Sequence, residues 1–470
     1  MERLKKVGTV VPKSSKDVKF SKLGIGFEKL DRAVFDPNKA YDPVGALGVK
    51  WVRIQSGWQR TESQKGVYDF AWMDEIVDNL LDRGLQPWVC MCYGNGLYDD
   101  LAAQTYGGVG CLPIRSQEAN QAWLAYCKAF AAHFAGRITH YEVWNEPDGA
   151  WCSKNGFTAA EYGKFTDDTA VAIKSAYADA KVIGGALCKH NGLAYLAEAL
   201  QNHMGDHIDL LSFHEYGKDE RRILERVEGL RAMLDRFCPH VGIIQGESGA
   251  PSRSDGHGAV RKGAWTEERQ AKLLLRHLVT DLTTGVEFTM YFSTMDMIEA
   301  LNGVVGDKAS YLDYGYFGVL RAEFDEDGNS IGEYSPKPSY FALQNLASLL
   351  AEAEPNVMPV TMRYKEAPRQ LLRGANLERQ DILCAGFRKD GGEAFAYWYP
   401  ADLMTTTYEG SVSPEIYAPY GKIRLVDPMD GSIYEIPENM VERTAAGTVT
   451  VVNLPIKDYP MFLTFGDFEM

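Results

Sequence analysis

Short apolar segments alternate with amphipathic segments between residues 20 and 350. Eight of the apolar segments are rich in β-branched or aromatic residues, and we predict them as strands at 23–27, 49–55, 86–93, 138–145, 181–187, 207–214, 241–246 and 286–293. Such apolar strands are typical of a sheet covered on both faces, and alternation with helices favours parallel pairing. Eight strand–helix units in about 330 residues predict an α/β fold, a (β/α)8 TIM barrel with long loops.

An open, doubly wound α/β sheet is the alternative arrangement for these units. A dinucleotide-binding sheet of that kind needs a G-x-G-x-x-G turn after its first strand. Here Gly24 and Gly26 are not followed by the third glycine. The helical segments have clear boundary signals, such as the capping box formed by Thr158 and Glu161. The barrel is therefore the favoured prediction.

The sequence changes character after Pro355. Helical periodicity stops there, and short alternating segments separated by turns continue to the C-terminus. This pattern predicts a small all-β sandwich. We therefore predict a catalytic barrel at 1–353 and a β-sandwich at 354–470, and the first 20 or so residues could join either domain.

The composition is that of a globular protein, with 45% apolar and 24% charged residues. No segment approaches the roughly 20 apolar residues of a membrane-spanning helix, and the N-terminal segment lacks the apolar centre of a signal peptide. We therefore expect a cytoplasmic protein. The net charge of −15 disfavours binding to nucleic acid. The sequence leaves open whether the chain forms a homo-oligomer.

The eight cysteines are scattered and form no metal-ligand spacing. Cys90 and Cys92 share one face of a predicted strand, where packing in the core is the favoured interpretation. The ends of successive strands also lack clustered histidine and aspartate ligands. We expect reduced thiols, and we predict neither a metal nor a cofactor.

Two glutamates follow predicted strands at the barrel end where active sites form. The fourth strand continues into Asn145, Glu146 and Pro147, and Pro147 cannot extend strand pairing. The seventh strand continues into Glu247. The fourth and seventh strands face each other across the mouth of the barrel, so both carboxyl groups can reach one bond.

A pair of carboxyl groups is what the cleavage of a glycosidic bond requires. One protonates the leaving oxygen, and the other stabilises or bonds the sugar carbon. When two carboxyl groups lie about 5–5.5 Å apart, the negative charge of one raises the pKa of the other. One therefore stays protonated while the other is ionised. The sequence thus predicts a glycosidase with Glu146 and Glu247 as its catalytic residues.

The glutamates at the ends of the fourth and seventh strands, the first within Trp144-Asn145-Glu146-Pro147, resemble the catalytic signature of clan A glycoside hydrolases. The segment YEVWNEPDG, the C-terminal β-domain and the FALQNL helix are most similar to family 39, which includes β-xylosidases, while families 5 and 51 are close alternatives. The resemblance covers nearly the whole chain and implies a retaining mechanism.

The resemblance also implies roles for individual residues. Glu146 would be the acid/base and Glu247 the nucleophile, and Asn145 would bind the sugar 2-hydroxyl. Arg53 and Tyr216 would keep the nucleophile ionised and oriented, because a cation and a phenol donor both favour the charged carboxylate. In the same way His214 would lie close to the acid/base and to the substrate.

Aromatic residues near the strand ends are candidates for sugar contacts. Trp58, Tyr93, Asn95, Trp144 and Trp151 could all contact sugar, but aromatic residues are more often part of the core, and of this group we expect only Trp144 and Tyr93 to contact the substrate.

The sequence departs from the clan pattern at the end of the eighth strand. A tryptophan platform is usual there, but this chain has none, and Met290, Tyr291 or Phe292 must line that wall. The glycine-rich segment after the third strand, 93–113, is long enough to form a pocket, which favours an exo-acting enzyme.

Other acidic residues have competing interpretations. Glu215 rivals Glu247 as a catalytic residue, but strand alternation directs it away from the face that His214 and Tyr216 share. Arg53 could instead be a core ion-pair partner. We interpret Glu142 as a structural residue of the barrel interior, and Glu28 and Asp31 as solvated loop charges.

The favoured function is therefore a retaining exo-glycosidase that acts on small oligosaccharides or glycosides through a covalent glycosyl-enzyme. The alternatives are a transglycosylase and a carbohydrate-binding barrel without catalysis. A binding protein has no use for two glutamates on opposing strands, because their repulsion costs stability. The sequence does not identify the sugar or the linkage.

Overall fold

A computed structural model describes residues 4–363, 381–389, 391–417, 421–445 and 447–468. Eight parallel strands form a closed barrel in chain order: β2 (Leu23–Gly26), β3 (Trp51–Gln55), β4 (Gln86–Met91), β5 (His140–Val143), β6 (Lys181–Leu187), β7 (Leu210–His214), β8 (Gly242–Ser248) and β9 (Thr289–Tyr291). The predicted TIM barrel is confirmed. Because β2 pairs with β9, the sheet has no open edge, which excludes the doubly wound alternative.

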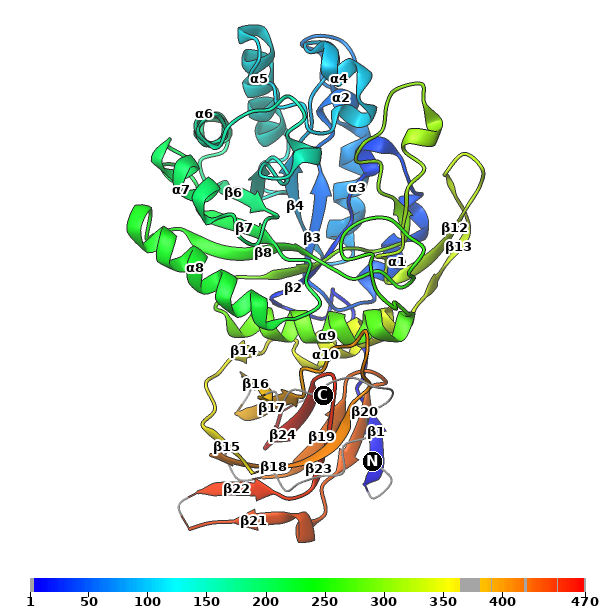
Figure 1. Cartoon of the computed structure of the whole chain (residues 1–470), viewed down its shortest axis with the longest axis vertical. Coiled ribbons are helices and arrows are strands. Elements are labelled where there is room, and N and C mark those ends of the chain that lie inside the picture. Colours follow the sequence, from blue (N-terminus) through cyan, green and yellow to red (C-terminus); the bar gives the residue numbers. More distant parts are fainter. Residues whose placement is uncertain (1–3, 364–380, 390, 418–420, 446, 469–470) are drawn as a thin grey trace.

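Helices surround the barrel, as Figure 1 shows. They are α1 (Tyr41–Gly45), α2 (Trp58–Thr61), α3 (Ala71–Asp82), α4 (Asp100–Gln104), α5 (Gln117–His133), α6 (Ala159–Ala176), α7 (Leu193–Gln201), α8 (Arg221–Phe237), α9 (Glu267–Thr283) and α10 (Pro338–Leu349). The predicted capping box at Thr158 and Glu161 begins α6. Two small hairpins lie between β9 and α10: β10 (Met297–Ile298) with β11 (Tyr314–Gly315), and β12 (Leu320–Phe324) with β13 (Ser330–Pro336).

The interior of the barrel has two chemically different layers. Apolar side chains fill the lower layer, which contains Trp88, Ile183, Leu210, Ile244, Phe288 and Met290. Arg53 lies above this layer, with its guanidinium 5.5 Å from the ring of Trp88, and it pairs with the fully buried Glu142. Burying charge in this way is stable only when the charges are paired. The polar layer therefore lies above the apolar one and is held together by paired charges.

The C-terminal region consists of antiparallel sheets. A seven-stranded sheet has the order β1 (Lys5–Thr9), β20 (Ser432–Glu435), β19 (Ile423–Asp427), β24 (Met461–Phe465), β17 (Gly392–Trp398), β16 (Leu383–Lys389), β14 (Glu354–Pro355). A second sheet has the order β15 (Val360–Arg363), β18 (Glu409–Tyr417), β22 (Thr448–Val451), β21 (Val441–Arg443), and β23 (Leu454–Lys457) also pairs with β18. This arrangement is consistent with the predicted β-sandwich. The N-terminal β1 contributes an edge strand, and the boundary between 353 and 354 stays a prediction.

Helices α9 and α10 lie between the barrel and the C-terminal sheets (Figure 1). Every residue of α9 from Gln270 to Leu282 is buried, because the helix is covered on both sides. All eight cysteines are free thiols, as expected. No helix within the described ranges is long and apolar enough to cross a membrane.

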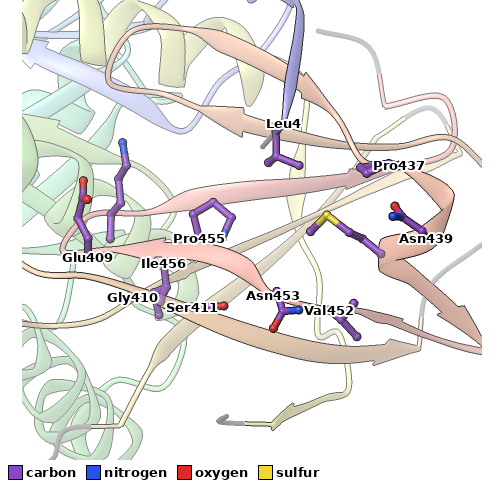
Figure 2. Close-up of a pocket in the computed structure, with 12 residues that line it drawn as sticks. Leu4, Glu409, Gly410, Ser411, Pro437, Asn439, Val452, Asn453, Pro455 and Ile456 are labelled. Carbon is purple, nitrogen blue, oxygen red and sulfur yellow. The ribbon is translucent and has the colours of Figure 1, made fainter. Parts of the chain in front are cut away.

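A cavity of about 900 Å³ opens in the C-terminal domain rather than at the barrel mouth (Figure 2). Its lining includes Ser411, Asn439 and Asn453 beside the apolar Leu4 and Ile456. No aromatic side chain of the described residues lines it. Glu146 and Glu247 are not among the residues that line this cavity.

Candidate active site

Glu146 is presented by a turn, not by the strand itself. Strand β5 ends at Val143, earlier than predicted, because Trp144 and Glu146 adopt left-handed backbone conformations with φ of 69° and 45°. Such conformations cost about 1–2 kcal/mol per residue. Packing offsets this cost: the Trp144 ring is fully buried, and its indole N–H donates to the carbonyl of Cys152 at 2.9 Å.

Glu247 lies within β8, which extends two residues beyond the predicted end. The preceding residue, Gly246, makes this possible, because a Cβ there would lie 2.2 Å from the hydroxyl oxygen of Ser212 on β7. At the same level the register between β7 and β8 shifts, between Phe213 and His214. A larger residue than glycine would require the Ser212 hydroxyl to move.

The two glutamates converge on His214. A carboxylate oxygen of Glu146, a ring nitrogen of His214 and a carboxylate oxygen of Glu247 all lie within 4.8 Å of one another. His214 Nδ1 is 3.0 Å from Glu146 Oε1 and 3.5 Å from Glu247 Oε2. Retaining glycosidases have carboxyl groups about 5–5.5 Å apart, whereas inverting enzymes need about 6.5–9.5 Å. The observed proximity fits the retaining arrangement.

Arg53 connects four acceptors beneath the site. Its Nη1 is 2.9 Å from Glu247 Oε2 and 3.0 Å from Glu28 Oε1, and its Nη2 donates to Glu142 at 2.5 Å and to Asn145 Oδ1 at 2.8 Å. The two predictions for Arg53, a core ion pair and a partner of Glu247, therefore both hold geometrically. A guanidinium can do this because its donors are fixed in one plane.

Tyr216 holds the second oxygen of Glu247. Its hydroxyl donates to Glu247 Oε1, so both carboxylate oxygens have a donor. Glu215 points elsewhere, with its carboxylate 2.7 Å from Arg226 and 3.2 Å from His190. The expected alternation along this segment thus separates Glu215 from the reactive pair.

Trp151 contacts the acid/base candidate, which sequence reasoning missed. Its indole N–H donates to Glu146 Oε2. Trp144 and Tyr93, expected to contact sugar, are 0% and 2% exposed and pack edge to face at 5.4 Å. Their burial does not favour direct contact with a ligand, although Tyr93 borders a cavity of about 220 Å³. The one available signal was the position of Trp151, five residues after Glu146.

The expectation that Glu28 and Asp31 are solvated loop charges was wrong. Glu28 is 2% exposed and pairs with Arg53, and the Asp31 side chain is 4% exposed and lies 3.4 Å from Arg32. The loop after β2 folds into the mouth of the barrel, so its acidic residues are buried among cations. Glu28 thereby joins the charge network of the site.

The three residues proposed to line the wall at the end of β9 have different surroundings. Met290 belongs to the apolar layer of the barrel, and Tyr291 donates its hydroxyl to the carbonyl of Ala250. The Phe292 ring instead lies 5.1 Å from Lys29 Nζ, a residue that directly follows Glu28. Of the three candidates, Phe292 therefore lies next to the loop that bears Glu28.

Charge and burial set the proton affinities in the site. Burial, followed by the charge of Glu28, raises the pKa of Glu247 to about 7, while His214 and Arg53 oppose this rise. Burial lowers the pKa of His214, but the charges of Glu247 and Glu146 outweigh it, so the pKa is raised. His214 and Glu247 therefore influence each other's protonation, and a pH profile reports the two groups together.

We expect Glu28→Gln to move the acidic limb of the kcat/KM profile to lower pH. This limb reports the ionisation of the free enzyme, and activity falls as Glu247 becomes protonated. Removing the negative charge of Glu28 lowers the pKa of Glu247, so the carboxylate persists to lower pH. The measurement is kcat/KM against pH, with the exposed Glu287→Gln as control. An acidic limb that stays in place or moves upward would contradict this electrostatic account.

The same three residues are a potential metal site. Glu146, His214 and Glu247 each offer one ligand atom. Among the described residues, these three are the group of possible metal ligands that lie close enough together to hold an ion. However, Arg53 and Tyr216 already donate to both oxygens of Glu247. A guanidinium at 2.9 Å would repel a divalent cation bound to the same carboxylate. The donor set therefore fits a metal poorly.

We accordingly expect hydrolysis to survive exhaustive treatment with a chelator. Two protein carboxyl groups can serve as acid, base and nucleophile, so the predicted chemistry needs no Lewis acid. The measurement is kcat/KM before and after chelation and dialysis. Loss of activity that a divalent cation restores would refute this expectation.

Comparison with known proteins agrees with the geometry. The model of glycosyl hydrolases family 39 matches residues 39–352, which is more than half of the chain. A family 39 glycoside hydrolase from Bacteroides cellulosilyticus WH2 has a similar structure, with a TM-score of 0.62, 18% identity, and coverage of 95% of this chain and 81% of that chain.

Two further solved structures share the fold. A family 39 β-xylosidase from Caulobacter crescentus has a TM-score of 0.57 and 17% identity over 98% of both chains. An α-L-arabinofuranosidase from Thermotoga maritima has a TM-score of 0.54 and 15% identity over 97% of both chains. The predicted resemblance is confirmed: the chain belongs to glycosyl hydrolases family 39 and is a retaining glycosidase.

Proposed function

We propose that this enzyme removes a terminal sugar from small oligosaccharides or glycosides by double displacement, with Glu146 as acid/base and Glu247 as nucleophile. The observation that carries the proposal is the convergence of the two carboxylates within 4.8 Å, together with the distinct partners of each. Glu247 is held by Arg53 and Tyr216, and Glu146 by His214 and Trp151.

In the first step, the Glu247 carboxylate attacks the anomeric carbon and forms a bond to it. The bond from that carbon to the leaving oxygen breaks, and Glu146 gives its proton to that oxygen. In the second step, water attacks the same carbon, Glu146 accepts the proton of the water, and the bond to Glu247 breaks. One carboxyl must therefore be neutral and the other ionised at the start.

The partners of the two glutamates support these roles. The Arg53 cation and the Tyr216 hydroxyl both favour the anionic form of Glu247, as a nucleophile requires, and they act against the burial and the Glu28 charge that raise the pKa of this carboxyl to about 7. Asn145 accepts from Arg53 through Oδ1, and its amide nitrogen donates to Cys152 Sγ at 3.5 Å, which leaves one N–H for the sugar 2-hydroxyl. Such a contact strengthens as positive charge develops on the sugar.

Contacts between two loops over the mouth support exo action. In the glycine-rich segment after β4, the Tyr106 amide donates to the carbonyl of Gly303 at 2.9 Å, and Gln104 accepts from the Val305 amide at 2.9 Å. The ring of Tyr106 also stacks on Tyr311 at 4.3 Å. The two loops thus form a continuous wall on one side, which favours a pocket for a chain end over an open cleft.

A substrate screen tests the proposal. Aryl β-xyloside, β-glucoside, β-galactoside and α-L-arabinofuranoside should be assayed with the wild type and with Glu247→Ala, which separates the activity from contamination. An oligosaccharide of the preferred sugar, labelled at the reducing end, should then lose one unit at a time from the other end. Early release of internal fragments would contradict exo action, and activity that survives in Glu247→Ala would contradict the assigned nucleophile.

A further inference from the structure

A buried hydrogen-bond network joins the C-terminal domain to the loop that bears Tyr216. At the end of β17, the indole N–H of Trp398 donates to Glu220 Oε1 at 2.7 Å. Arg276 of α9 donates to both oxygens of Glu220, at 2.9 and 2.6 Å, and to the carbonyl of Ala401 at 2.7 Å. The side chains of Glu220 and Arg276 are 0% and 1% exposed. Each charge in this network is therefore fully paired.

Glu220 ends the short loop that begins after His214. The loop runs from β7 to α8, and Glu220 is the residue before α8 begins. His277, which follows Arg276 in α9, lies beside the backbone of Gly217 in the same loop. Two residues of one buried helix thus contact this loop at its middle and at its end. Tyr216, whose hydroxyl donates to the reactive Glu247, directly precedes the first of these contacts.

The same face of the C-terminal domain also contacts the loop after β8. Leu403 packs in an apolar cluster with Ala250, Trp265 and Leu273. A buried ion pair of 3.1 Å between Lys272 of α9 and Asp458 adds a further connection. The contacts therefore reach the loops that follow β7 and β8. Tyr216 lies in the first of these loops, and Glu247 lies near the end of β8.

We propose that the C-terminal domain positions Tyr216 against Glu247 through the network of Trp398, Glu220 and Arg276. In this arrangement Trp398 and Glu220 are positioning residues, and neither touches the substrate. The network fixes the end of the loop, the loop fixes the Tyr216 hydroxyl, and the hydroxyl orients the nucleophile. The inference rests on the proposed roles of Tyr216 and Glu247. It gives the C-terminal domain a part in catalysis that does not depend on sugar binding.

Trp398→Phe tests the inference because it removes the N–H donor and keeps an aromatic ring. We expect kcat/KM to fall about 3- to 10-fold, since small displacements of catalytic groups are costly. The acidic limb of the pH profile should move to higher pH, because a displaced Tyr216 stabilises the Glu247 carboxylate less. The matched control is Tyr397→Phe, which removes a hydroxyl that donates to the carbonyl of Pro455 at 3.0 Å within the C-terminal domain. This control should keep the wild-type profile.

A double-mutant cycle separates positioning from simple loss of stability. Tyr216→Phe should lower kcat/KM about 10- to 100-fold, as expected for a hydrogen bond to a charged group. Adding Trp398→Phe to Tyr216→Phe should then change kcat/KM little, because the hydroxyl that the network positions is already absent. Arg276→Lys keeps a cation but cannot reach both Glu220 and Ala401, so it should act in the same direction as Trp398→Phe.

The outcomes distinguish the inference from the proposed function. If Tyr216→Phe keeps full activity, the role of Tyr216 fails and the inference fails with it. If Tyr216→Phe is impaired while Trp398→Phe only unfolds at lower temperature and keeps its kcat/KM and pH profile, the inference alone is wrong. Fully additive effects in the cycle would also overturn it.

Discussion

Glu247→Ala is expected to lower kcat by a factor on the order of 10⁴ or more, because it removes the covalent route, and losses of this size accompany removal of a catalytic nucleophile. The variant also leaves a gap beside Arg53 and Tyr216 that a small anion can enter. Azide or formate should therefore restore turnover of an activated aryl glycoside by attacking from the face that Glu247 occupied. The product should have the anomeric configuration opposite to that of the substrate, which NMR spectroscopy measures.

The matched control for this experiment is Glu287→Ala. Glu287 is an exposed carboxylate just before β9, at the end of the barrel away from the reactive pair. It should keep wild-type activity and gain nothing from azide. A rescued Glu247→Ala product of retained configuration would show that Glu247 is not the nucleophile.

Glu146→Ala is expected to affect substrates according to their leaving groups. General acid catalysis contributes about 10²–10⁴-fold, and it matters only where the leaving oxygen needs a proton. Hydrolysis of an alkyl glycoside or an oligosaccharide should therefore slow by about that factor, whereas formation of the glycosyl-enzyme from an activated aryl glycoside should slow far less. Added azide should attack the intermediate without base catalysis and give a glycosyl azide of retained configuration.

The measurement is kcat/KM over a series of aryl glycosides with increasing leaving-group pKa. The variant should show a steep dependence and the wild type a shallow one. Equal loss for all leaving groups would refute the acid/base role of Glu146. Retention from Glu247→Ala combined with inversion from Glu146→Ala would mean that the two roles are exchanged.

Several features of this protein followed from the sequence by itself. The eight barrel strands and the β-rich C-terminal region could be predicted because the pattern of apolar residues is local and repeats along the chain. Glu146 and Glu247 could be assigned to one mouth because parallel strands in a barrel all end on the same side. The family could be predicted for a related reason, since its signature is a short motif at a strand end.

The tertiary structure alone decided which side chains are buried and what they contact. In sequence, Glu28 is a charged residue just after a strand, and this position does not distinguish a solvated side chain from a buried one. Glu28 becomes part of the site only because its loop folds over Arg53. Trp144 and Trp151 both lie near Glu146 in sequence, yet the first is enclosed by the core and the second donates to the carboxylate. Burial and partners depend on segments far apart in the chain, such as Trp398 and Glu220, which are 178 residues apart. No local pattern records those contacts, because they form only when the barrel and the C-terminal sheets pack together.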